Sequence, residues 1–166
     1  MFYRVRQFIH AIFPYVDPSD INWALDHLSL EASNLFLLQS KPEQRHAIDV
    51  AKSINKIVPT LSFYDFQNLI TAALLHDCGK SVACIRLWQR IYIVLIQKMP
   101  PFLRSHLKRG NSIFAISIKI DERHALWGEY LAKKAGLNSM VCLLIREHHT
   151  PTTDLGRILE QADNMN

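Results

Sequence analysis

Apolar residues recur along this chain at the spacing of three to four positions that is typical of amphipathic helices. One stripe lies near the N-terminus and consists of Phe2, Val5, Phe8, Ile9, Ile12 and Phe13. Another follows Ser62 and Asp65, whose spacing resembles a capping box, and consists of Phe66, Leu69, Ile70, Ala73 and Leu74. The pattern contains no convincing sheet, so the fold class that it predicts is all-α, a single-domain helical bundle.

Prolines and glycines divide the pattern into segments. The expected helices cover residues 21–27, 30–38, 41–57, 62–79, 87–99, 122–134, 139–147 and 155–162. We expect residues 111–118 to form a short strand or a loop that packs across the site. Residues 1–40 are interpreted as N-terminal helices packed on the core, and residues 41–166 as the main unit. Because Arg4 and Arg6 flank the first stripe, it could contact a membrane surface or a partner, but docking on the core is favoured.

Composition narrows the class of protein. The chain has 166 residues, enough for one domain with a full core, and 49% of them are apolar. The net charge of +4 suits an anionic substrate but does not indicate binding to a nucleic-acid duplex. Three cysteines without a CxxC pair argue against a disulfide framework. The chain is not expected to span a membrane, because its longest apolar run, residues 91–96, is far short of the roughly 20 residues that a span needs. The N-terminus lacks the features of a signal peptide, so a cytoplasmic location is expected.

Five of the eight histidines form an ordered set with two aspartates. The set is His46, His76, Asp77, His124, His148, His149 and Asp163. Neutral imidazole and carboxylate are the usual ligands of divalent transition metals. Seven such groups are enough for two ions that share a bridging ligand and keep positions open for water and substrate.

Asp77 gives this interpretation a physical reason. An apolar helix carries His76 and Asp77 into the interior, and an unpartnered buried carboxylate costs several kcal/mol. A metal cation offsets that cost. Neighbouring helical residues diverge by about 100°, so both would reach one ion only where the backbone loosens, and Gly79 supplies that freedom. The alternative is a helix cap, in which Asp77 bonds to local backbone groups.

The ordered set resembles the HD-domain superfamily of metal-dependent phosphohydrolases, whose pattern is H…HD…D. Residues 72–80, AALLHDCGK, nearly match the central family motif A-L-L-H-D-x-G-K. His46, followed by Val50 and Ala51, looks like the first motif. His124 with Gly128 is similar to the H-x-x-x-G element of the HDIG and HD-GYP branches, and the pair at 148–149 matches their paired histidines. The resemblance covers roughly residues 43–163.

The resemblance implies a role for each residue of the set. A first metal is assigned to His46, His76, Asp77 and Asp163; a second is assigned to Asp77, as the bridge, with His124, His148 and His149. Lys80 is expected to contact the substrate phosphate, so Lys80 and Asp77 are the predicted catalytic residues. The implied function is hydrolysis of a phosphate monoester or phosphodiester, a nucleotide or cyclic nucleotide, by metal-activated water. The cofactors are two divalent ions, Mn, Fe, Mg or Zn.

The sequence also departs from the family. Residues 150–154, TPTTD, follow the histidine pair, and no Gly-Tyr-Pro occurs, so the cyclic-di-GMP specificity of the HD-GYP branch is not implied. Two alternatives remain open: a binuclear-iron oxygenase of the same superfamily, and a non-catalytic signalling module that keeps a structural metal. Arg45 and Arg146 are further candidates for phosphate contacts, although a surface role is favoured for each. The substrate, the metal and the oligomeric state are left open.

Overall fold

The computed structural model describes residues 15–57, 61–82, 92, 95–96, 99–108 and 112–166. Every element in these ranges is helical, which confirms the all-α prediction. The elements are α2 (Pro18–Asp26), α3 (Leu30–Leu38), α4 (Lys41–Ile57), α5 (Phe63–Leu75), the 3₁₀ turn η1 (Cys78–Val82), α7 (Pro101–Leu107), α8 (Ile113–Lys134), α9 (Ser139–Glu147) and α10 (Asp154–Met165). The helix expected at 2–13 and most of the one at 87–99 lie outside the described residues. The division at residue 40 stays a prediction.

Side-chain caps fix where several of these helices begin. Ser62 accepts a hydrogen bond from the Asp65 amide at 3.1 Å and donates to Asp65 Oδ2 at 2.7 Å, so the predicted pair does begin α5. Ser112 caps α8 by accepting from the Ala115 amide at 3.1 Å. Asn138 caps α9 in the same way. These caps satisfy amide groups that have no partner inside the helix.

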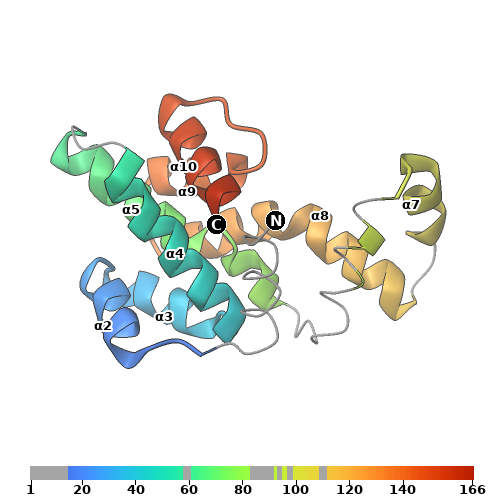
Figure 1. The fold of residues 1–166 in the computed structure, drawn as a ribbon, viewed down its shortest axis with the longest axis horizontal. Coiled ribbons are helices and arrows are strands. Elements are labelled where there is room, and N and C mark those ends of the chain that lie inside the picture. The colour runs from blue at the N-terminus through green and yellow to red at the C-terminus, as the bar shows by residue number, and fades with distance from the viewer. Residues whose placement is uncertain (1–14, 58–60, 83–91, 93–94, 97–98, 109–111) are drawn as a thin grey trace.

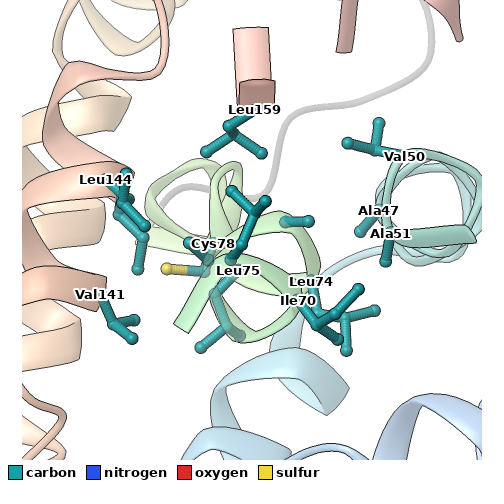
Figure 2. Close-up of a cluster of buried hydrophobic side chains, with 14 of the residues drawn as sticks. Ala47, Val50, Ala51, Ile70, Leu74, Leu75, Cys78, Val141, Leu144 and Leu159 are labelled. Atoms are coloured by element: carbon teal, nitrogen blue, oxygen red, sulfur yellow. The ribbon is translucent and has the colours of Figure 1, made fainter. Parts of the chain in front are cut away.

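The core forms around α5, which packs against α4, α9 and α10 (Figure 2). Leu74 and Leu75 of α5 are fully buried, as are Ala47 and Ala51 on the facing side of α4. These alanines are one helical turn apart, so α4 can approach α5 closely. Leu144 of α9 closes the cluster from the other side. The C-terminal end of α5 is therefore held between several helices.

Gly79 allows η1 to lie directly on α8, next to Gly128. A Cβ built on Gly79 would overlap the carbonyl oxygen of His124 and lie 2.6 Å from the Gly128 amide nitrogen. A Cβ on Gly128 would lie 2.8 Å from Cγ2 of Ile145. The backbone of η1 can pass α8 at this distance because residue 79 has no side chain, while a Cβ at 128 would meet only the end of a side chain of α9. The contact brings the segment after α5 against the middle of α8 (Figure 1).

Three predictions about elements were wrong. Residues 113–118 are helical, not a strand or loop, because Ser112 caps α8 and Ala115 and Ile118 are buried at helical spacing. His124 therefore lies in the middle of this helix and does not open one. The helix expected to end at Gly79 ends at Leu75, and Gly79 lies in η1. The predicted helix end at residue 134 is confirmed, and Gly136, two residues later, has a positive φ of 73°.

The sequence argued against a membrane span and against a disulfide framework, and both points can be compared with the described residues. None of the helices there is long and apolar enough to cross a membrane. Cys78 and Cys142 are free and buried, while Cys84 lies outside the described residues.

Candidate metal centre

Side chains from five segments of the chain meet at the C-terminal end of α5. Ligand atoms lie within 4.8 Å of one another in each of two groups, His46 with His76 and Asp77, and His124 with His148 and His149. The groups are contributed by α4, by the turn between α5 and η1, by α8, and by the residues just after α9. α10 adds Asp163. All seven predicted ligands are thus brought together, although they span 117 positions of the sequence.

Three of the histidine rings are held by the same kind of backbone contact. In each, Nδ1 lies within hydrogen-bond distance of the carbonyl oxygen three residues earlier: 2.8 Å for His76, 2.5 Å for His124 and 2.7 Å for His148. A carbonyl can only accept, so Nδ1 must carry the proton. In the neutral ring, Nε2 then presents a lone pair. This fixed tautomer and orientation are what a metal-ligating histidine requires.

The Nε2 atoms of the second group face one another. His124 Nε2 lies 3.1 Å from Nε2 of both His148 and His149. Burial lowers the pKa of His149 and lowers that of His148 well below its usual value, so these rings are neutral near pH 7. Because the Nδ1 atoms of His124 and His148 both donate to backbone carbonyls, the two rings turn their Nε2 atoms toward each other. A divalent cation can bind both Nε2 atoms, so the donor set fits a metal.

The first group is joined to α10 through Asp163. Asp163 Oδ1 lies 2.8 Å from His46 Nε2 and 3.8 Å from His76 Nε2. Burial alone would raise the pKa of Asp163, but the hydrogen bond from His46 and the nearby His76 outweigh it and hold this pKa well below its usual range. The pKa of His46 is raised because Asp163 and Asp77 outweigh the opposing effect of burial. Carboxylate and imidazole therefore form a close pair that a metal ion could share.

Asp77 lies between the two groups. Its Oδ2 is 3.6 Å from His76 Nε2, and its Oδ1 is 3.3 Å from His124 Nε2. The side chain is almost fully buried, and burial raises the pKa of a carboxyl group. The charge of Lys80 outweighs the effect of burial, with smaller contributions from His76 and His124, and holds the pKa of Asp77 well below its usual value. Asp77 is therefore a buried anion with one oxygen directed at each group.

Lys80 contacts the centre directly. Its Nζ donates to Asp77 Oδ2 at 2.7 Å, and its side chain is 25% exposed. Burial lowers the pKa of Lys80, but the charge of Asp77 and the hydrogen bond to it raise this pKa further, so the amine is protonated. The cation thus lies at the edge of the cluster, next to the predicted bridging ligand.

The two candidate arginines are engaged elsewhere. Arg45 forms ion pairs with Asp20 of α2 and Asp49 of α4, and Arg146 donates to Glu129 at 3.3 Å. Each guanidinium therefore already has a carboxylate partner. Arg146 is 55% exposed, in line with the surface role favoured from the sequence, whereas Arg45 is only 13% exposed and joins α2 to α4.

The sequence analysis missed Glu147, the last residue of α9. This side chain is only 5% exposed and accepts hydrogen bonds from the amides and hydroxyls of Thr152 and Thr153. These bonds outweigh burial and lower the pKa of Glu147. The signal in the sequence is a glutamate that ends an apolar helix and is followed by two threonines before the next helix.

Comparison of the chain with protein-family models, with curated proteins and with solved structures finds no match in any of the three. The chemistry of the cluster therefore rests on the residues and distances described above.

Proposed function

We propose that this protein is a metal-dependent hydrolase of phosphate monoesters or phosphodiesters, with two divalent ions shared by the seven-residue cluster. The observation that carries the proposal is the position of Asp77. Its two oxygens lie 3.6 Å and 3.3 Å from the Nε2 atoms of His76 and His124, which belong to different groups. A buried carboxylate with one oxygen toward each set of imidazoles is the arrangement of a bridging ligand.

The residues divide between the two ions as the groups divide in space. His46, His76, Asp77 and Asp163 would hold one ion, and Asp77, His124, His148 and His149 the other. Two divalent ions held there would supply hydroxide from water near neutral pH and neutralise charge on a phosphate ester. The buried backbone contacts of His76, His124 and His148 fix those rings before any ion arrives, which lowers the cost of ordering them.

A phosphate ester suits the charges around the cluster. Lys80 is a partly exposed cation held by Asp77, so its ammonium group could also contact a non-bridging phosphate oxygen. The resemblance to HD-domain phosphohydrolases supports the same reaction and suggests a nucleotide or cyclic nucleotide as the substrate, which is an argument by analogy.

The test is hydrolysis by the metal-loaded protein. The purified chain is loaded with Mn, Fe, Mg or Zn and assayed against a panel of phosphate monoesters and diesters. Asp77→Asn is the inactive variant, and His106→Ala, which removes an exposed histidine of α7, is the matched control. Hydrolysis by the wild type and the control, but not by Asp77→Asn, is expected.

Two other results would contradict the proposal. Metal-loaded protein that hydrolyses no member of the panel would favour a non-catalytic module. Oxygen consumption by the iron-loaded protein, without phosphate release, would favour an oxygenase.

A further inference from the structure

Glu147 occupies an unusual position next to the cluster. It is the last residue of α9, directly before His148 and His149, and its carboxylate is buried. A buried carboxylate needs several hydrogen bonds to offset the loss of water. Glu147 obtains such bonds from the segment that follows the histidines.

Two consecutive threonines supply four donors to this carboxylate. The Thr152 amide lies 2.8 Å from Oε2 and the Thr153 amide 3.2 Å from Oε1, and each hydroxyl donates to the same oxygen as its own amide. Thr153 also caps α10, because its Oγ1 accepts from the Gly156 amide at 2.9 Å. One hydroxyl therefore links Glu147 at the end of α9 to the first turn of α10.

Gly156 shows how closely α10 lies on the carboxylate. A Cβ at this position would overlap Oε1 of Glu147 and lie 2.9 Å from Oγ1 of Thr153. The first turn of α10 therefore rests on the Glu147 side chain, and the absence of a side chain at 156 permits this.

The position of α10 matters because this helix carries Asp163. Asp163 lies nine residues after Asp154, about 14 Å along the axis at 1.5 Å per residue. A tilt of about 10° at the start of the helix would move Asp163 by roughly 2 Å over that length. Such a shift is comparable to the whole 2.8 Å separation of Asp163 from His46.

We infer that Glu147 is a positioning residue of the metal centre, which fixes the angle between α9 and α10 through Thr152 and Thr153. The inference rests on the proposed function. α9 is followed directly by two ligands of one group, His148 and His149, and α10 carries Asp163, which lies with the other group. Glu147 thus keeps the two sets of ligands at a fixed distance without touching either ion.

The experiment uses variants that change the hydrogen bonds and little else. Glu147→Gln replaces an acceptor by a donor at nearly constant shape. Thr152→Val removes one hydroxyl that donates to Glu147, and Thr152→Ser keeps it, so this pair serves if Glu147→Gln does not fold. Glu31→Gln, at an exposed position of α3, is the matched control.

Each variant is measured in two ways. Amide hydrogen exchange on the metal-free protein follows Gly156 and Arg157 of α10, with Ala32 of α3 as the internal reference. Titration with cobalt, followed by its visible absorption, then gives the affinity of the centre.

For Glu147→Gln we expect exchange at Gly156 and Arg157 to accelerate by about 10-fold while exchange at Ala32 is unchanged. The dissociation constant for cobalt should rise about 10–100-fold, the usual cost of losing a residue that orients metal ligands. Thr152→Val should show smaller changes in the same direction, and Thr152→Ser and Glu31→Gln should match the wild type. A loss of overall stability alone would accelerate Ala32 as well.

The two measurements separate the possible failures. Unchanged exchange in Glu147→Gln overturns the inference that Glu147 holds α10. Faster exchange with unchanged cobalt affinity overturns its link to the metal centre. A wild type that takes up no cobalt refutes the proposed function and with it that link, while the exchange measurement still decides whether Glu147 holds α10.

Discussion

Replacing Gly79 by alanine should destabilise the fold at the point where η1 crosses α8. The added Cβ would meet backbone atoms: the carbonyl oxygen of His124, and the amide nitrogen of Gly128 at 2.6 Å. Backbone atoms cannot rotate away as the end of a side chain can. The crossing must therefore open, and His124 must move away from Asp77, from which it is now separated by 3.3 Å.

The magnitude follows from what the Cβ meets. Overpacking typically costs about 1–3 kcal/mol, and a contact with helix backbone belongs at the upper end, at about 3 kcal/mol. In a domain of this size, about 1 kcal/mol lowers Tm by 2–4 °C, so Gly79→Ala should lower Tm by about 6–12 °C. Gly128→Ala meets a side-chain methyl of Ile145 at 2.8 Å. It also gains about 1 kcal/mol of helix propensity, so its net effect should be near zero.

The assay is thermal unfolding of metal-free protein, followed by far-ultraviolet circular dichroism, for the wild type and both variants. Gly128→Ala is the matched control, since it adds the same methyl group at the same crossing. If Gly79→Ala unfolds within about 2 °C of the wild type, η1 does not lie against α8 as closely as described, and the reasoning is refuted.

Three further predictions concern charged residues. The pKa of Asp20 is lowered by Lys52 and then by Arg45, so its stabilising effect is present above the ordinary carboxyl pKa of about 3.9 and is lost as pH falls through the lower folded value. Asp20→Asn should therefore cost about 1 kcal/mol at pH 7, and this cost should shrink as pH falls below the ordinary carboxyl pKa, as measured by urea unfolding. Under the proposed function, Lys80→Met should keep its metals yet lose turnover by about 10²–10³-fold, because its cation would no longer contact the charge of the substrate; unchanged kinetics would refute this. Asp77→Ala should lose both metal and activity, and full metal content by elemental analysis would contradict the bridging role.

Much of the fold could be predicted because its signals are local. The bounds expected at 30–38, 41–57 and 139–147 agree with α3, α4 and α9. Prolines, caps and helical spacing act within a few residues, and here they coincide with tertiary packing. The beginning of α8 was missed because Ile116, Ile118 and Ile120 alternate with polar residues in a strand-like pattern. In the structure the cap at Ser112 and burial against the core outweigh that preference.

For the candidate site too, the sequence predicted one part, the identity of the residues, and not the other, their contacts. The order of histidines and aspartates predicted which residues to compare, and the structure brings all seven together. The sequence did not predict the 2.8 Å separation of His46 from Asp163 or the ion pair of Lys80 with Asp77, since both depend on how α10 and η1 pack. Glu147 was missed for a similar reason, because its hydrogen bonds exist only once the turn at 150–153 is formed.

Metal stoichiometry tests the central claim most directly. Elemental analysis of metal-loaded protein should find about two ions per chain in the wild type and about one in His124→Ala, with hydrolysis strongly reduced, because the remaining ion cannot act on both the attacking and leaving oxygens. The account would be contradicted by a wild type that binds a single ion and a variant that binds the same ion with undiminished activity.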